Sequence, residues 1–191
     1  MPGHRATAAK CRLAILLGLS WIIFGLVGPA GAEVVDFKEL LPFVDIKIPG
    51  WTMEGKPSGT TLKQDKVMVS EARVSFRAGD QTLEVIIMDF MGKTIPFLTG
   101  QQLEMESSEE TVRTTEVQGF KAFETFRHQE RQGGLNISVA DRFWVKIDAE
   151  GIDNLEVLKN VAQQMDLKKL AALAKKAGDQ YVTQAGNLGR T

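Results

Sequence analysis

The sequence predicts an α+β fold: a single antiparallel sheet of about six strands, with a C-terminal helix and a short middle helix packed on one face. Three observations support this. Apolar and polar side chains alternate in several short segments, as they do in half-buried strands. Tight turns at residues 78–81, 118–119 and 132–134 favour antiparallel pairing of neighbouring strands. A C-terminal stretch repeats its apolar residues at helical spacing, which supplies the second layer.

Residues 1–32 have the composition of a signal peptide. A basic start precedes the apolar run Leu13–Val27, and the small residues that follow end in an Ala-x-Ala cleavage site at Ala32. The apolar run is shorter than the roughly 20 residues of a membrane-spanning helix. We therefore expect cleavage after Ala32 and a periplasmic or secreted bacterial protein. Retention of the segment as an N-terminal membrane anchor is the alternative.

The exported part is expected to be one α+β domain at residues 33–177, followed by a flexible polar tail at 178–191. Cleavage removes three of the 23 basic residues and none of the 24 acidic ones, so the exported chain is mildly acidic. A nucleic-acid partner is not expected, because it normally requires a basic surface. The single cysteine, Cys11, lies in the signal segment, which removes disulfide and thiol chemistry from the domain.

Residues 135–147 form the expected centre of the domain. Six apolar residues alternate there with the period of two of a strand that has one buried face. They are Leu135, Ile137, Val139, Phe143, Val145 and Ile147. The intervening residues keep the parity, so we expect one continuous strand, or a strand with a bulge at Asp141.

A helical stretch at residues 153–177 is expected to cover this strand. Asp153 is the expected N-cap, with Glu156 as its reciprocal capping partner. The apolar stripe shifts its phase after Met165, and Asp166 stands at the join, where it could cap a second helix. The pattern therefore allows two helices with a break near Asp166, or one long bent helix.

The remaining elements follow from alternation and from the positions of glycine and proline. In chain order they are a lead-in helix or coil (34–41), a strand (43–48), a loop (54–61), a strand with a bulge near Ser70 (67–77), a hairpin turn (78–81), a central strand (82–90), a short helix (96–105), a polar edge strand (111–117), a strand (120–128) and a hairpin turn at Gly133 and Gly134 (132–134).

The run Val139–Val145, followed by residues 153–170, resembles the end of small, uncharacterised secreted bacterial proteins. The general layout of those proteins is similar to the PsbP/Mog1-like α/β sandwich. The resemblance covers residues 43–173 in layout and only the last third in residue pattern. It implies a fold and a periplasmic setting, and it brings no catalytic residues.

No catalytic, cofactor or metal motif occurs in the sequence. His128 is the one histidine of the exported part, and no Gly-x-Ser-x-Gly elbow accompanies it. A zinc site needs several histidine or cysteine ligands. The acidic group Glu104, Glu106, Glu109 and Glu110 lacks the alternating Asp/Asn–Gly loop that wraps calcium. We therefore expect neither a cofactor nor a metal, and the sequence favours a non-enzymatic protein.

Five aromatic residues are the candidates for a ligand or partner surface: Trp51, Phe120, Phe123, Phe126 and Trp144. Aromatics on both faces of a strand can line a pocket between a sheet and a helix. Ordinary core packing is the alternative. Together these observations predict an exported, non-enzymatic envelope domain that binds a partner protein or a small apolar ligand. A signal-anchored accessory subunit of a membrane complex and a carboxylate-based hydrolase are the alternatives.

Overall fold

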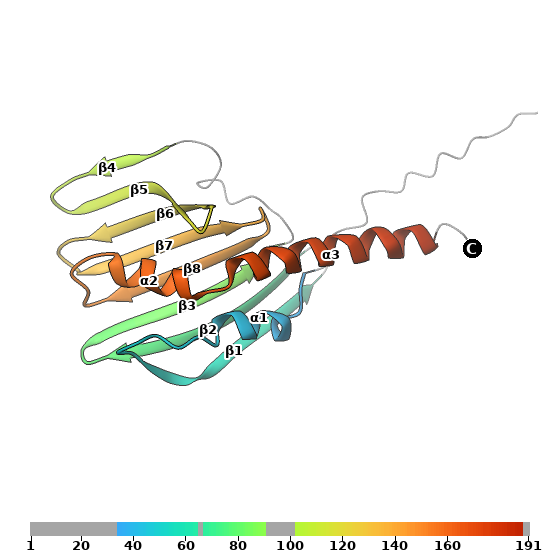
Figure 1. The fold of residues 1–191 in the computed structure, drawn as a ribbon, viewed down its shortest axis with the longest axis horizontal. Coiled ribbons are helices and arrows are strands. Elements are labelled where there is room, and N and C mark those ends of the chain that lie inside the picture. Colours follow the sequence, from blue (N-terminus) through green and yellow to red (C-terminus); the bar gives the residue numbers. More distant parts are fainter. Residues whose placement is uncertain (1–33, 65–66, 91–101, 189–191) are drawn as a thin grey trace, which may run out of the picture.

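In the part of the chain that the structure describes, eight antiparallel strands form one sheet, and three helices pack against it (Figure 1). The computed structural model describes residues 34–64, 67–90 and 102–188. The α+β class and the single antiparallel sheet are confirmed, whereas the expected number of about six strands is too low.

In chain order the elements are α1 (Phe37–Val44), β1 (Thr52–Gln64), β2 (Val67–Ala78), β3 (Gln81–Asp89), β4 (Glu104–Glu106), β5 (Glu110–Val117), β6 (Phe120–Arg127), β7 (Gln132–Val139), β8 (Phe143–Glu150), α2 (Glu156–Gln164) and α3 (Leu167–Leu188). The strand order in the sheet is β1-β2-β3-β8-β7-β6-β5-β4. One meander, β1–β3, therefore joins a second, β4–β8, through the antiparallel pair of β3 and β8.

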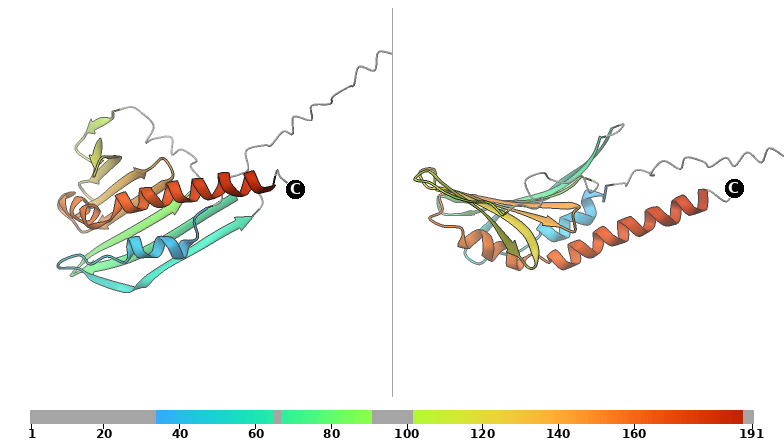
Figure 2. Two further views of the ribbon diagram at one scale, coloured as in Figure 1. Left: turned by 45° about the vertical axis from the view of Figure 1, so that its right-hand side comes forward. Right: turned by 90° about the horizontal axis from the view of Figure 1, so that it is seen from above.

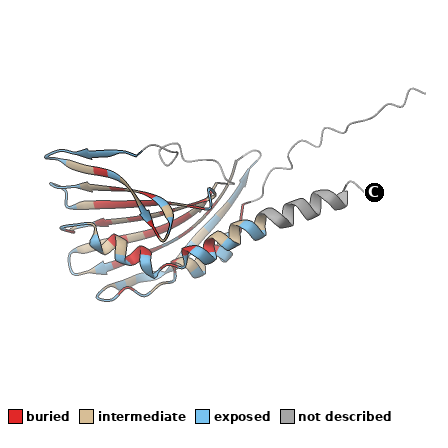
Figure 3. Ribbon diagram, turned by 45° about the horizontal axis from the view of Figure 1, so that its top comes forward, coloured by how far each residue is buried: buried red, intermediate tan, exposed pale blue. Residues whose placement is uncertain are grey.

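The two faces of the sheet differ in what covers them. The side that carries Leu135 and Ile147, called the helix face here, packs against α1, α2 and α3 (Figure 2). The opposite side, the open face, carries Gly134 and Asp148. Buried residues gather on the central strands and on the sheet-facing sides of the helices, whereas the edge strand β4 is exposed throughout (Figure 3). Among the described residues, no helix lies on the open face.

The six alternating apolar residues at the centre are all buried, but they lie on two strands. They make three cross-strand pairs on the helix face: Leu135 with Ile147, Ile137 with Val145, and Val139 with Phe143. The expected continuous strand is wrong because Ala140 and Asp141 take positive φ angles of 54° and 50° and reverse the chain. The turn keeps the parity of the alternation, so each of the six side chains still points to the same face.

Two helices cover this hairpin, and the chain breaks between them at Met165 and Asp166, which confirms the two-helix alternative. Leu158, Ala162 and Leu170 are fully buried and belong to the same core as the central strands. α3 runs past the sheet to Leu188 (Figure 1), into the stretch for which the sequence predicts a flexible tail. That tail stays a prediction.

Short polar side chains bind backbone N–H groups at the start of these helices, although the N-cap residue of α2 itself is Leu155. Asp166 Oδ1 accepts a hydrogen bond from the backbone N–H of Lys169 at 2.9 Å, as expected for the cap of a second helix. The expected cap at Asp153 is wrong. Asn154 Oδ1 accepts from the first backbone N–H of α2, at 3.0 Å, while Asp153 forms an ion pair with Arg131.

The expected strand at 43–48 is wrong, because α1 extends to Val44. Asp36 caps α1 by accepting from the N–H of Lys38 at 2.9 Å. The expected loop at 54–61 belongs to strand β1, whose register against β2 shifts between Glu54 and Ser58. An edge strand with a bulge tolerates glycine and proline, which explains why these residues do not end it.

Three expectations for the middle of the chain are also wrong, and a fourth falls largely outside the described residues. β2 keeps a continuous register with β3, so no bulge occurs near Ser70. The expected helix at 96–105 lies largely outside the described residues, and its end belongs to β4. β5 is not the edge strand, because β4 pairs with it on the outside. Gly133 and Gly134 lie within strand β7, after a turn at residues 128–131.

A buried ion pair ties the start of the domain to the central hairpin. Asp89 is fully buried at the end of β3, and Arg142 Nη2 donates to its Oδ2 at 2.7 Å. The backbone N–H of Val35 donates to the same carboxylate oxygen, also at 2.7 Å. One carboxylate thus joins the segment before α1, strand β3 and the β7–β8 turn.

Replacing this carboxylate tests its role. We expect Asp89→Asn to lower the free energy of unfolding by about 3 kcal/mol, because it removes the buried negative charge that Arg142 binds. Arg77→Gln, which breaks an exposed ion pair with Glu54, serves as the control and should leave stability unchanged within error. Both are measured by chemical denaturation, and equal effects of the two substitutions would contradict the proposed role.

Gly133 marks the closest approach of the helical layer to the sheet. A Cβ at this position would lie 2.7 Å from Leu155 Cδ2 and 2.8 Å from Ile152 Cδ1. We expect Gly133→Ala to destabilise the domain by about 1–3 kcal/mol, because it overpacks the core. Gly134→Ala should change stability by less than about 1 kcal/mol, since its nearest contacts, at 3.0 Å and 3.2 Å, are longer than those at Gly133 and lie on the open face. Denaturant titrations compare the two, and the reverse order would refute the assignment of faces.

Candidate functional site

A cavity of about 240 Å³ opens on the open face, where β6, β7 and β8 run side by side. Its lining consists of glycine and polar residues from these three strands: Thr125, Arg127, Gln132, Gly133, Gly134, Asn136, Lys146 and Asp148. The sequence did not single out any of these residues as a site residue. Those with side chains stand at the polar positions of alternating strands, and such positions usually signal only solvent exposure.

The cavity exists because Gly134 has no side chain in the middle of a cross-strand row. Thr125 and Asp148 are its partners on β6 and β8. A Cβ on Gly134 would lie 3.0 Å from Thr125 Oγ1, 3.2 Å from Asp148 Oδ1 and 4.0 Å from Asn136 Nδ2. A hydroxyl, a carboxylate oxygen and an amide nitrogen therefore surround the same small space.

Trp144 fixes the orientation of the amide. Its indole Nε1 donates to Asn136 Oδ1 at 3.0 Å, so the amide oxygen is engaged away from the cavity. Nδ2, a donor, is then the amide atom nearest to Gly134. Asn136 is only 9% exposed, and a buried amide held in this way is a preorganised hydrogen-bond donor.

The charged groups of the cavity are paired within the protein. Lys146 forms an ion pair with Asp148. Arg127 Nη1 donates to Gln132 Oε1 at 3.2 Å, and its Nε lies 3.5 Å from Glu110 Oε1. The lining therefore contains both signs of charge.

Charged side chains of the first meander, β1–β3, are also paired within the protein. Arg73 binds Glu71 and Arg77 binds Glu54, and the hydrogen bond in each pair raises the pKa of the guanidinium. Arg73 is thus bound by a carboxylate of its own strand, β2, and Arg77 by a carboxylate of the neighbouring strand, β1.

The structure separates the five aromatic candidates. Trp51, Phe120 and Phe126 are partly buried and pack against the hydrophobic core. Phe123 and Trp144 lie on the open face: Phe123 is the cross-strand partner of Asn136, and Trp144 is bonded to it. Two of the five candidates therefore adjoin Asn136, which lines the cavity, and three pack against the core, so the five do not form one surface.

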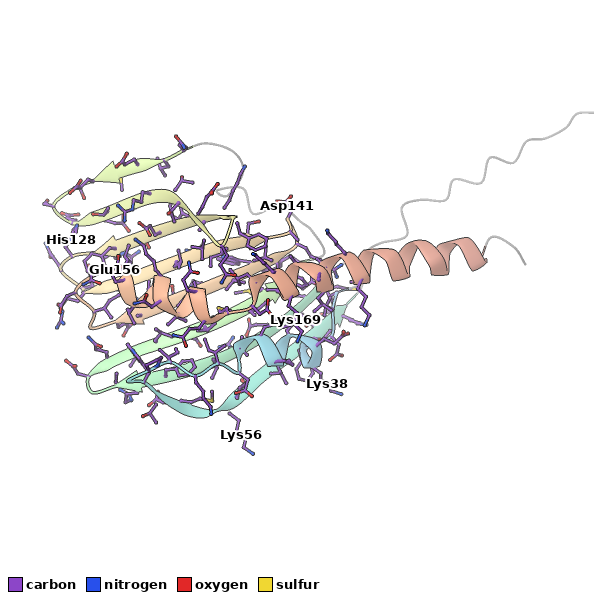
Figure 4. All side chains as sticks on the ribbon, in the orientation of Figure 1. Lys38, Lys56, His128, Asp141, Glu156 and Lys169 are labelled. Carbon is purple, nitrogen blue, oxygen red and sulfur yellow. The ribbon has the colours of Figure 1, made fainter. Side chains whose placement is uncertain are left out.

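The other chemical candidates do not assemble into a site. His128 bonds to Thr111 Oγ1 at 3.1 Å and stands at the opposite end of the strands from Asp141 (Figure 4). Within the described ranges, no group of three or more His, Cys, Asp or Glu side chains is placed to hold a metal. A search of the described helices finds none with the length and apolar character needed to span a membrane.

Glu124 is a buried carboxylate that could be considered as a catalytic group, but it lies on the helix face. It is 1% exposed, and Arg113 Nε donates to its Oε1. Lys159 of α2 places Nζ 3.6 Å from Oε2. The carboxylate therefore links β5 and β6 to the helix above them, and β6 separates it from the open-face cavity.

Glu124→Gln tests this structural role. We expect it to lower the free energy of unfolding by about 1–3 kcal/mol, because Arg113 loses its buried counter-charge and Lys159 keeps only its ion pair with the exposed Glu156. Glu116→Gln, on the exposed side of β5, is the control and should have no measurable effect. Unchanged stability together with the loss of a hydrolytic activity would instead assign Glu124 a catalytic role.

No protein-family model, curated protein or solved structure matches this chain. The resemblance to proteins with a PsbP/Mog1-like sandwich therefore stays a prediction. Function must be argued from the geometry of the open face itself.

Proposed function

We propose that this chain is an exported, non-enzymatic binding domain of the bacterial cell envelope, and that its ligand or partner docks on the open face over Gly134. The observation that carries the proposal is the cavity, where polar side chains of three strands converge on a glycine. A site built on paired strands is rigid, so its groups keep their positions before a ligand arrives. Export rests on the signal-peptide pattern of residues 1–32.

Binding accounts for the chemistry of the cavity better than catalysis does. Hydrolysis by carboxylates needs two such groups roughly 5–10 Å apart on either side of the substrate. Asp148 is the one carboxylate in the lining, and it is held by Lys146. Glu124 belongs to the other face.

The lining also favours one kind of occupant. The sequence suggests either a partner protein or a small apolar ligand. The lining of the cavity contains no aromatic or aliphatic side chain, so it does not suit the apolar ligand. A polar group, free or carried by a partner, can exchange hydrogen bonds with Thr125, Asn136 and Asp148. We therefore propose a polar occupant.

Nuclear magnetic resonance of the isotopically labelled exported chain tests this proposal. We expect concentrated small-molecule and protein fractions of a bacterial periplasm to shift the amide signals of β6, β7 and β8 around Gly134. Gly134→Leu fills the cavity and should abolish these shifts. Ser75→Leu lies on the same face, three strands away, and should preserve them.

Melting temperatures decide whether both variants are folded, and Gly134→Ala replaces Gly134→Leu if the leucine variant does not fold. Shifts on the helix face, or shifts that persist when the cavity is filled, would overturn the proposal.

A further inference from the structure

We propose that the cavity over Gly134 recognises a neutral, hydroxyl-rich ring, that is, one sugar unit of a carbohydrate. This inference rests on the proposed function, because it names the class of ligand that the same site would take. Three properties of the cavity point to it: the balance of its charges, the alternation of its donors and acceptors, and its size.

Charge argues against an ionic ligand. An anion would be attracted by Lys146 and Arg127 but repelled by Asp148. A cation would be attracted by Asp148 but repelled by the two basic side chains. Each of these charges already has a partner: Lys146 and Asp148 hold each other, and Glu110 and Gln132 hold Arg127. A charged ligand that contacts one member of such a pair is repelled by the other member. A neutral ligand can add hydrogen bonds and leave the pairs intact.

The polar atoms around Gly134 match hydroxyl groups. Asp148 Oδ1 can only accept a hydrogen bond, Asn136 Nδ2 can only donate one, and Thr125 Oγ1 can do both. All three lie within 4.0 Å of the point where a Gly134 Cβ would stand. A single hydroxyl can therefore donate to Asp148 and accept from Asn136 at the same time. Bonds to the ionised carboxylate are the stronger ones, which gives this hydroxyl a fixed orientation.

The volume limits the ligand to one ring. The cavity holds about 240 Å³, which is below the roughly 300–1,000 Å³ of pockets for drug-sized ligands. It is open to solvent on a sheet face, so a longer chain could continue outside it. Few ligand atoms make contact, and we therefore expect affinity for a single sugar on the order of millimolar.

Trp144 acts on this site as a positioning residue. Trp144→Phe keeps an aromatic ring but removes the N–H that holds Asn136 Oδ1. We expect it to weaken sugar binding when Asn136 is present and to have no further effect in the Asn136→Ala background. Such a double-mutant cycle separates orientation of the amide from a general effect on folding.

The main test titrates the exported chain with methyl glucoside and N-acetylglucosamine as neutral probes, glucuronate as the anionic probe and glucosamine as the cationic probe. We expect the neutral sugars to bind at least about tenfold more tightly than the charged ones. Asp148→Asn should weaken neutral binding about tenfold and should invert the order in favour of glucuronate, because it frees Lys146. Glu84→Gln, the cross-strand neighbour of Asp148 outside the lining, is the matched control and should change neither.

The outcomes separate this inference from the proposed function. If a non-carbohydrate ligand shifts the signals around Gly134 while no sugar binds, the carbohydrate assignment is overturned and the binding site stands. Tighter binding of glucuronate or glucosamine to the unmodified chain also overturns the assignment. If neither sugars nor periplasmic fractions reach the open face, both proposals fail.

Discussion

The structure depends on the burial of one hairpin face beneath two helices. Three pairs of apolar residues from β7 and β8 meet the fully buried side chains of Leu158, Ala162 and Leu170. Burial of this kind supplies most of the free energy that offsets the entropy of ordering the chain. The break at Met165 and Asp166 lets the helical layer change direction and stay on the sheet. Every other element is placed relative to this core: β3 extends it into the first meander, and β6 extends it into the second.

A sheet covered on one side needs a polar opposite side, and this requirement creates the candidate site. Because successive residues of a strand point to opposite faces, Gly133 and Gly134 serve different surfaces. The absence of a side chain at Gly133 lets Ile152 and Leu155 approach the sheet. The same absence one residue later leaves a space among polar groups. Two successive glycines of one strand thus have different roles, because Gly133 lets the helices pack on one face and Gly134 leaves the cavity on the other.

Much of the core could be predicted from the sequence, because alternation reports which face a residue occupies and not which strand carries it. The alternation predicts one strand for the six central residues. The structure divides them between two strands, yet all six point to the expected face, since the turn at Ala140 and Asp141 preserves their parity. The turn itself escaped prediction because residues other than glycine adopt its positive φ angles. β1 escaped because glycine and proline usually end strands, whereas an edge strand with a bulge accepts them.

The cavity could not be predicted for a related reason. Two adjacent glycines beside a glutamine are typical of a turn, whereas in the structure both lie in a strand, and the close approach of the helical layer explains the first of them, Gly133. Asn136, Lys146 and Asp148 have no distinctive spacing, because their proximity to Thr125 depends on the register of three strands. Once that register is set, the ion pair of Lys146 and Asp148 and the bond from Trp144 to Asn136 hold the polar atoms in place without a ligand. Selectivity at such a surface follows from groups that are already paired. A charged ligand competes with one member of an ion pair, whereas a neutral ligand can add hydrogen bonds and leave the pair intact.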